Sequence, residues 1–376
     1  MEVQRMAVNC AACPTYTCRL GHTDLGPDDC PMKDDFPDPA VLYDDDKIRL
    51  AREAALIEAR GYREWTRLEE TVELATQLGV SVVGVGYCPD VEPEVHAFAR
   101  YLEDCGFQVV LPEPHASGSC TPLEQAHTLR VAGAELNVIA GMCVGHDALF
   151  MKAVRVPVVA LIARDTFLQH NPVAALYGAR GYFRNALDRA HKQPRSDDTD
   201  TESLLQQAAQ DPLGEPGAEL ASIADAISRE GTGKWSRIEE VLEFAARGGA
   251  RKLGIVFCHG LREEAKVLDR VLRVNGFEVA SVGCKAGAYP KEFIRIEDHE
   301  QVNPGGLEVM CNPLAQAELL NREKTDLNLL LGQCVGHDTA TIAALDALAV
   351  YVVVKDRVLA HNTVAALYRK MAADRR

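Results

Sequence analysis

The second half of the chain alternates short apolar runs with longer segments in which apolar residues recur at the period of an α-helix. The apolar runs lie at 252–257, 277–282, 327–331 and 349–354. The helical segments lie at 235–247, 263–275, 313–322, 339–348 and 363–371. Strands that are apolar throughout and are separated by helices are typical of a parallel sheet covered on both faces. The first half shows the same alternation, with strands expected near 80–86, 107–111, 135–141 and 156–163.

The two halves are copies of one another. Early in each half the matching residues are 170 positions apart, as for the pairs Ile57 and Ile227, Gly61 and Gly231, Trp65 and Trp235, Arg67 and Arg237, Glu69 and Glu239, and Cys88 and Cys258. Later the separation is 191, as for CVGHD at 143 and 334 and for HNPVAALY at 170 and HNTVAALY at 361. The change means that 21 residues of the second copy lack a counterpart between Val110 and Cys120.

The repeat predicts an α/β protein with two tandem Rossmann-like or flavodoxin-like parallel-sheet domains. We expect a small cysteine-rich metal-binding segment at 1–40, a first repeat at 41–194 and a second repeat at 220–376. Residues 195–219, rich in Asp, Ser, Thr, Pro and Gly, are expected to form a solvated linker.

Four cysteines of the second repeat occur where its strands end. Cys258, Cys284 and Cys334 follow the first three strands, and Cys311 lies in a turn before a helix. In an open parallel sheet, ligands bind outside the carboxyl ends of the strands. A thiol before a helix N-terminus is also favoured as thiolate, the form that binds metals. The four are therefore predicted to meet at one rim and to hold a metal ion or cluster; buried structural thiols are the alternative.

The first repeat keeps three of these cysteines, Cys88, Cys120 and Cys143, and the counterpart of Cys284 falls in its missing stretch. Three thiolates can hold a cluster with one iron open, or a metal with an open position. Two alternatives remain: the first repeat is a degenerate copy, or a cysteine of the leading segment completes its site. Cys105 aligns with Asn275 near a helix end and is expected to be structural.

The leading segment carries Cys10, Cys13, Cys18 and Cys30 in the spacing C-x2-C-x4-C-x11-C. Few apolar residues surround them, so a bound metal would have to supply the free energy that burial does not. Four thiolates suit tetrahedral zinc or a [4Fe–4S] cluster. A disordered tail with incidental cysteines is the alternative.

Two pairs of histidines accompany the rim cysteines. His146 and His337 lie three residues after a rim cysteine, and His170 and His361 open the HN motif that follows the last strand. We expect them to bind a cofactor at the rim as ligands, proton donors or groups that orient a ligand. Capping or packed histidines are the alternative.

Composition narrows the functional classes. The 376 residues carry a net charge of −15, which argues against a nucleic-acid or anionic-membrane binder. No apolar run approaches the roughly 18–20 residues of a membrane span, and no secretory pattern is present, so we expect a soluble cytoplasmic protein. In that compartment twelve cysteines indicate metal or redox chemistry rather than disulfides. No phosphate-binding glycine pattern or serine nucleophile elbow occurs in the sequence.

Several longer motifs resemble a known family. They are CAAC and CPMK in the leading segment, and FCHGLREEAKVL, VGCKAG, MCNPLAQAELLN, TDLNLLLGQCVGHD and VVKDRVLAHNTVAALY in the second repeat. The chain resembles bacterial and archaeal cysteine-rich proteins that form a domain-of-unknown-function family and are labelled metal-binding proteins. The resemblance implies metal binding and no established reaction. Typical members carry one copy of the domain; this chain carries two and lacks the CKxG element in the first.

The sequence thus favours an iron–sulfur protein, with [4Fe–4S] as the cofactor. It would either exchange electrons with a redox partner or act as a cluster-dependent enzyme on a small molecule. The alternatives are a zinc protein with structural or regulatory sites, and a thiol-based module for metal trafficking or sensing.

Overall fold

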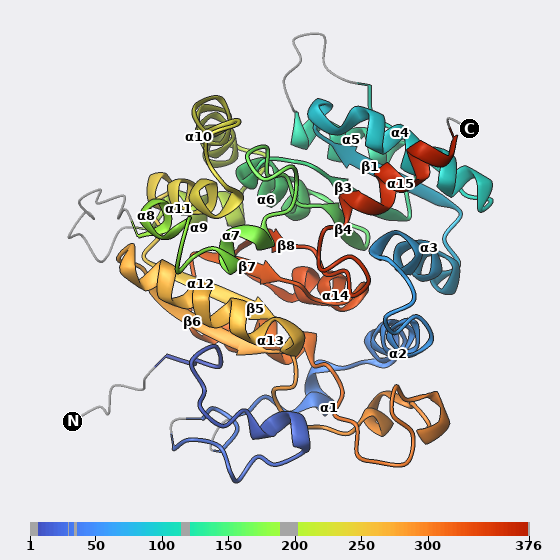
Figure 1. Ribbon diagram of the computed structural model, residues 1–376, viewed down its shortest axis with the longest axis vertical. Helices are drawn as coiled ribbons and strands as arrows, with labels where there is room; N and C mark the ends of the chain where they lie inside the picture. The colour runs from blue at the N-terminus through green and yellow to red at the C-terminus, as the bar shows by residue number, and fades with distance from the viewer. Residues whose placement is uncertain (1–6, 29, 34–35, 114–120, 189–201, 375–376) are drawn as a thin grey trace.

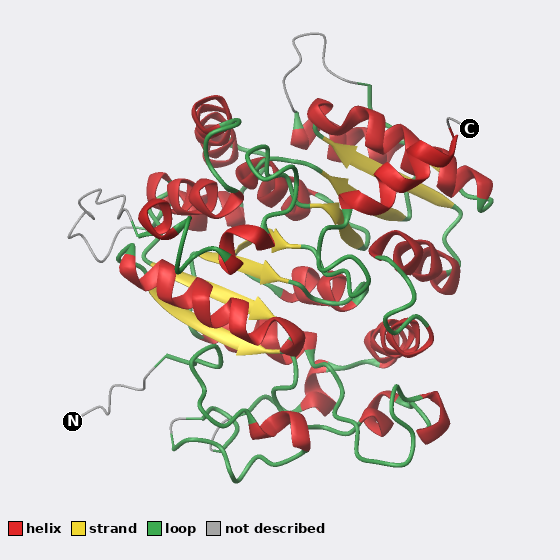
Figure 2. Ribbon diagram, viewed as in Figure 1, coloured by secondary structure: helices red, strands yellow, loops and turns green. Residues whose placement is uncertain are grey.

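The computed structural model describes residues 7–28, 30–33, 36–113, 121–188 and 202–374 (Figure 1). It contains two four-stranded sheets in which every strand pairing is parallel, with orders β2-β1-β3-β4 and β6-β5-β7-β8. Helices separate the strands and cover the sheets (Figure 2). The predicted α/β fold with two tandem parallel-sheet domains is confirmed, and the shared strand order is that of the first four strands of a flavodoxin-like sheet.

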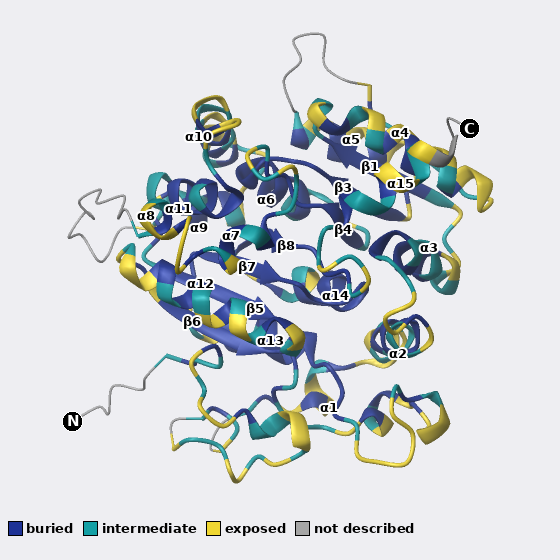
Figure 3. Ribbon diagram, in the orientation of Figure 1, coloured by how far each residue is buried: buried dark blue, intermediate teal, exposed yellow. Residues whose placement is uncertain are grey.

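The apolar runs form the strands, and most lie within two residues of their expected positions. The second sheet consists of β5 (Lys252–Phe257), β6 (Glu278–Gly283), β7 (Leu327–Leu331) and β8 (Leu348–Val353). Its helices are α12 (Arg262–Val274), α13 (Pro313–Arg322), α14 (His337–Ala344) and α15 (Val364–Asp374). Every residue of β7 and β8 is buried, as expected for strands covered on both faces (Figure 3).

The first repeat follows the same plan. Its strands are β1 (Val82–Tyr87), β2 (Gln108–Val110), β3 (Leu136–Ala140) and β4 (Val158–Ile162). Its helices are α4 (Glu92–Asp104), α5 (Pro122–Val131), α6 (Val144–Ala153), α7 (Val173–Tyr177) and α8 (Arg184–Leu187). The two sheets lie with β4 and β8 toward one another, so that α6 contacts β8 and α14 contacts β4 (Figure 1).

The helix pair that begins each repeat packs against the other repeat. The pairs are α2 (Asp45–Arg60) with α3 (Arg67–Leu78), and α10 (Glu215–Gly231) with α11 (Arg237–Arg247). Although α2 precedes the first sheet, it contacts α14 of the second repeat, while α10 and α11 contact α6 of the first.

Buried arginines at matching positions fix this exchange. Arg237 Nη2 lies 2.6 Å from Asp147 Oδ2 of the first repeat, and both residues are at most 2% exposed. Arg67 forms the corresponding ion pair with Asp338 of the second repeat. Each arginine also anchors its helix, because its backbone N–H donates to Asp165 or Asp356 at 2.9 Å. The two repeats are therefore held together by reciprocal, fully buried charge pairs.

The segment expected to be a solvated linker is partly packed structure. Within it, α9 (Leu204–Gln210) buries Leu205 and Ala208, and α10 begins at Glu215. Ser203 and Gln206 form a capping box at the start of α9. The small and apolar residues of 204–209 thus form a short amphipathic helix against the second sheet. The polar composition of residues 195–219 as a whole did not predict it. Residues 195–201 lie outside the described part of the chain.

Two irregular segments lie beside β6. The first is the cysteine-rich segment, which includes the short helices η1 (Thr17–Leu20) and α1 (Pro39–Leu42) and pairs Asn9 with Ser281 in parallel. The second is the stretch after β6, with η4 (Lys291–Ile294) and η5 (Asp298–Glu300), closed by a bridge between Pro290 and Val309. Two further single turns, η2 (Pro89–Val91) and η3 (His259–Leu261), follow β1 and β5.

Within the described ranges, no helix combines the length and the apolar character needed to cross a bilayer.

Replacing Arg237 by Leu should lower the free energy of unfolding by about 3–5 kcal/mol, because Asp147 would remain as a buried charge without its partner. Chemical denaturation measures the change. The control is Arg184→Leu, which removes a pair in which the arginine is 68% exposed and should cost less than about 1 kcal/mol. Equal effects of the two substitutions would contradict the role assigned to the crossed pairs.

Burial raises the pKa of Glu240 to about 7, although Arg164 Nη1 lies 3.7 Å away. Between the unfolded carboxyl's pKa and about 7 the folded state therefore holds a proton that the unfolded state has released. This stabilisation is complete below the unfolded pKa and is lost as pH rises toward 7. Between pH 4.5 and 7.5 the free energy of unfolding of the wild type should fall by roughly 3 kcal/mol through this group, and Glu240→Gln should abolish that fall. Denaturation at several pH values tests this, with exposed Glu263→Gln as a control that should leave the pH profile unchanged.

Candidate functional site

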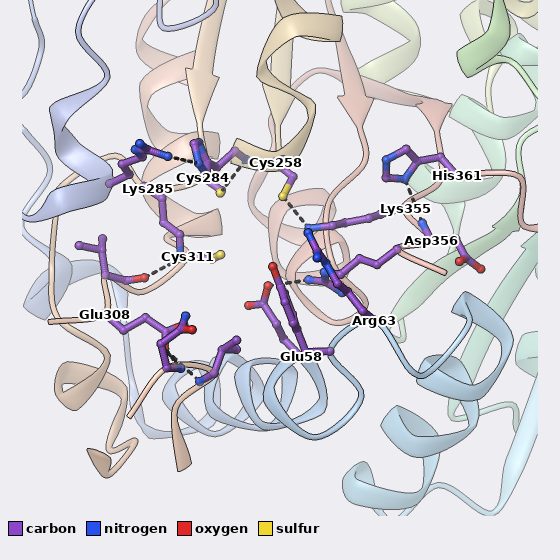
Figure 4. A pocket seen from close by; sticks show the side chains of 18 of the residues that line it. Glu58, Arg63, Cys258, Cys284, Lys285, Glu308, Cys311, Lys355, Asp356 and His361 are labelled. Atoms are coloured by element: carbon purple, nitrogen blue, oxygen red, sulfur yellow. Dashed lines mark hydrogen bonds and ion pairs between the residues drawn. The ribbon is translucent and has the colours of Figure 1, made fainter. Parts of the chain in front are cut away.

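A cavity of about 550 Å³ opens at the carboxyl ends of the strands of the second sheet (Figure 4). Three of the four predicted cysteines, Cys258, Cys284 and Cys311, line it together with Lys355 and Arg357. The fourth, Cys334, is buried behind Arg357, whose Nη2 lies 2.9 Å from its sulfur. The structure therefore brings the four second-repeat cysteines to one rim.

The ends of the strands position these thiols. Cys258 and Cys284 directly follow β5 and β6, and the backbone N–H of Cys258 still donates to Leu331 of β7. Cys334 follows β7 after a turn at Gly332, whose φ is +69°. A Cβ at Gly332 would lie 1.8 Å from the Leu261 side chain, so only glycine allows this turn to pack over η3.

The thiols influence one another's ionisation. Hydrogen bonding with Cys258 and Cys311 holds the pKa of Cys334 well below its ordinary value, despite burial. The same two neighbours, together with burial, raise the pKa of Cys284 well above its ordinary value. The four thiols therefore titrate as one coupled group, as expected for closely spaced thiols that share their protons.

Buried cations lie among the sulfurs. Lys355 Nζ donates to Cys258 Sγ at 2.6 Å and to Cys334 Sγ at 3.3 Å, and Lys355 is 5% exposed. Arg357 bridges Cys334 and Glu58, which lies 2.5 Å from its Nη2. Glu58 belongs to α2, so the helix pair of the first repeat completes the rim of the second.

Sequence reasoning missed three of these charged residues. Lys355 and Arg357 directly follow an apolar strand in VVKDR. Charged residues at that point of a parallel sheet lie at its ligand-binding edge, so their position in the sequence could have predicted them as site residues. Glu58 carried no signal, because its position in the repeat corresponds to Ser228 and it reaches the rim only through the exchange of helix pairs.

The four cysteines of the leading segment gather around a second, smaller cavity. Cys10, Cys13, Cys18 and Cys30 line it. Burial raises the pKa of Cys10 to about 12, and the charges of the other three add to that rise. The backbone N–H of Cys10 donates to Ser281 O at 2.9 Å, which ties the group to β6.

At the rim of the first repeat, the described residues include Cys88 and Cys143. Burial raises the pKa of Cys88 to about 11 and that of Cys143 to about 12, and the positive charge of Arg164 opposes both shifts. Arg164 Nη2 lies 2.7 Å from Asp90 Oδ2. Cys120 lies outside the described residues, and Cys105 is exposed at the end of α4.

The predicted histidines occupy different environments. His337 is buried, and although burial lowers its pKa, Cys311 and Cys334 raise it to about 10, so the ring is protonated near neutral pH. His361 lines the cavity of the second repeat, and its Nδ1 accepts a hydrogen bond from the backbone N–H of Asp356 at 3.1 Å.

In the first repeat, His170 makes the corresponding hydrogen bond with the backbone N–H of Asp165 at 3.3 Å. His146 is buried, with Nε2 3.5 Å from Asp225. The HN-motif histidines thus brace the loop after the last strand, whereas His337 belongs with the sulfurs.

The cations at the rim of the second repeat can stabilise negative charge on its buried thiols. Among the residues that the structure describes, however, no group of three or more His, Cys, Asp or Glu side chains is placed to hold a metal ion.

Comparison with known proteins identifies relatives. The model of the family described as "Protein of unknown function (DUF1847)" matches residues 32–113, 110–161 and 196–352. An uncharacterized protein of Methanocaldococcus jannaschii is 40% identical over 156 residues, which cover 42% of this chain and 79% of the relative.

Among solved structures, the Dph2 protein of Pyrococcus horikoshii with a 4Fe-4S cluster is 12% identical, with a TM-score of 0.22, covering 71% of this chain and 83% of that one. An aspartate racemase homologue from the same organism is 14% identical, with a TM-score of 0.18, covering 78% and 99%. Similarities this low carry no argument about a shared site. The family match spans most of the chain, and the chain belongs to the DUF1847 family.

Proposed function

We propose that this member of the DUF1847 family holds an iron–sulfur cluster of the [4Fe–4S] type at the carboxyl ends of β5 to β8. The observation that carries the proposal is the meeting of four buried free thiols, from the three connections that follow β5, β6 and β7, beside Lys355 and Arg357. The cluster would serve electron transfer with a redox partner, or the conversion of a small molecule in the adjoining cavity.

The donor set fits this group. Thiolates are the ligands of [4Fe–4S] clusters, and Cys258, Cys284, Cys311 and Cys334 would supply them. Lys355 supports anionic sulfur, because the hydrogen bonds of its buried ammonium go to two sulfurs. A buried ammonium is stable only beside compensating negative charge, which neutral thiols do not provide.

The cavity beside the thiols favours a cluster over a single zinc ion. Zinc requires its four sulfurs at about 2.3 Å from one point. Cys258, Cys284 and Cys311 line a cavity of about 550 Å³. A cluster brings its own sulfides and spans a larger volume than one ion, so space beside the thiols suits it.

The chain's own residues would tune such a centre. Lys355 and Arg357 donate hydrogen bonds to Cys258 and Cys334, and the backbone N–H of His259 donates to Cys284 Sγ at 3.2 Å. Hydrogen bonds and positive charge at the sulfurs stabilise the more negative, reduced state. When bound, the cluster supplies one-electron redox chemistry or, where an iron is open, a Lewis acid.

The walls of the cavity indicate which small molecules it would admit. Five basic residues line it: Arg19, Arg63, Lys285, Lys355 and Arg357. Of its three acidic residues, Glu308 pairs with Lys291 at 2.7 Å and Glu58 pairs with Arg357 at 2.5 Å; Asp356 is the third. This balance favours an anionic molecule of small size, held beside the thiols.

The first repeat offers a weaker site. Cys88, Cys120 and Cys143 stay candidate ligands there, with Arg164 as the counterpart of Lys355. Arg164 already pairs with Asp90, so its charge is compensated without an anionic cluster, unlike that of Lys355. We assign the functional centre to the second repeat.

Protein purified without oxygen should be brown, with near-equal amounts of iron and acid-labile sulfide. Cys334→Ala should lose about four irons and four sulfides per chain, because it removes a cluster ligand. The matched control Cys105→Ala changes an exposed cysteine and should retain the metal content of the wild type. Stoichiometric zinc without sulfide, or equal metal content in both variants, would count against the proposal.

Lys355→Met should keep the cluster but make its midpoint potential more negative, because a positive charge and two donors to sulfur are removed. A redox titration followed by electron paramagnetic resonance (EPR) measures the potential. Lys266→Met on the exposed face of α12 is the control, and it should leave the potential unchanged. An unaltered potential in Lys355→Met would show that the lysine does not act on the centre.

A further inference from the structure

The two groups of cysteines lie on opposite sides of one short turn. At the end of β6 and in the turn that follows, Gly283 and Ala286 line the cavity of the leading segment, while Cys284 and Lys285 line the rim cavity. The leading segment runs along β6, where Ser281 N donates to Val8 O at 2.7 Å. A single turn of backbone therefore separates the two sites.

Tyr16 fills the boundary between them. Its ring stacks on His259 with centroids 5.2 Å apart, and the Arg262 guanidinium lies 5.1 Å from the ring centroid. The backbone N–H of Tyr16 donates to Cys13 Sγ of the leading group at 3.3 Å. The tyrosine thus contacts the leading group through its backbone and the residues around the rim through its ring.

The hydroxyl of Tyr16 has no hydrogen-bond partner within the described part of the chain, although the residue is only 3% exposed. It lies over Gly283, where a Cβ would come within 2.1 Å of it, so glycine is required at that position. A buried hydroxyl without a partner leaves the cost of its desolvation uncompensated. An acceptor is therefore expected at this point when the protein is in its working state.

The hydroxyl of Tyr16 lies beside both groups of sulfurs. Tyr16 lines the leading cavity together with Cys10, Cys13, Cys18 and Cys30. Its hydroxyl lies over Gly283, the residue before the rim cysteine Cys284. The hydroxyl is thus placed to donate to an acceptor from either group.

We infer that the leading-segment cysteines form a second metal centre and that Tyr16 joins it to the rim centre, its hydroxyl donating a hydrogen bond to sulfur at their boundary. The inference rests on the proposed function of the rim. The ligand class of the second centre is again iron with sulfide, bound by Cys10, Cys13, Cys18 and Cys30.

The two proposed centres differ in their exposure to solvent. The leading cysteines are half-buried, whereas the rim cysteines are buried. An external one-electron carrier protein would therefore meet the leading segment first. The exchange that such a pair permits moves one electron from one centre to the other, and no proton or bond is transferred.

The first test is Tyr16→Phe, which keeps the ring and removes only the hydroxyl. We expect wild-type iron content with more negative midpoint potentials, because a donor to sulfur is lost. Tyr101→Phe in α4 of the first repeat is the control and should leave the potentials unchanged. Potentials in Tyr16→Phe equal to those of the wild type would overturn the role of the hydroxyl.

The second test is the EPR spectrum of the dithionite-reduced protein. The wild type should show a signal split by two neighbouring spins, and Cys13→Ser with Cys30→Ser should reduce it to the simple signal of the rim centre alone, with less iron. Zinc in the leading segment beside an intact iron–sulfur rim would overturn this inference and leave the proposed function standing. Absence of iron from both sites would overturn both.

Discussion

The exchange of helix pairs between the repeats is the constraint on which the rest of the structure depends. Arg67 and Arg237 each enter the opposite repeat and neutralise a buried aspartate at the start of a helix. Separating the repeats would leave four charges without partners in an apolar interior, which makes the two domains one energetic unit. The same contacts place α2 against the turn that carries Cys334, where a Cβ at Gly336 would come within 2.8 Å of Ala54.

The chemistry at the second rim follows from electrostatics imposed by this packing. Four thiols in an apolar place would stay protonated if nothing opposed burial. Lys355, Arg357 and a protonated His337 oppose it. Lys355 and His337 are themselves buried and need negative charge nearby. Cations and sulfurs therefore stabilise one another, and removal of either set would leave the other exposed to the full cost of desolvation.

Local sequence patterns predicted the scaffold well. Apolar runs predict the position of β5 and β7 to the residue. The rule that ligands gather at the carboxyl ends of parallel strands predicts from the sequence alone that Cys258, Cys284 and Cys334 meet. The repeat offsets also paired Arg67 with Arg237. Nothing in that pairing revealed that each arginine would act in the other repeat, because sequence matching compares positions and not their partners.

Sequence patterns did not predict Glu58 or Tyr16 as site residues, for similar physical reasons. Glu58 lies on an ordinary helical segment, and Tyr16 lies in a segment without periodicity, so tertiary packing alone gives them their places. The packed helix α9 was hidden because seven residues with a buried face are diluted by polar neighbours on both sides.

The crossed packing also bears on the history of the fold. In an ancestor with one copy of the domain, the same contacts would have required two chains, each lending its first helices to the other in a symmetric dimer. Fusion of the copies puts both halves on one polypeptide and removes the need for identical partners. The first repeat lacks the stretch that carries the fourth thiol in the second, yet its helices α2 and α3 still supply Glu58 and Glu70 to Arg357 beside the second rim.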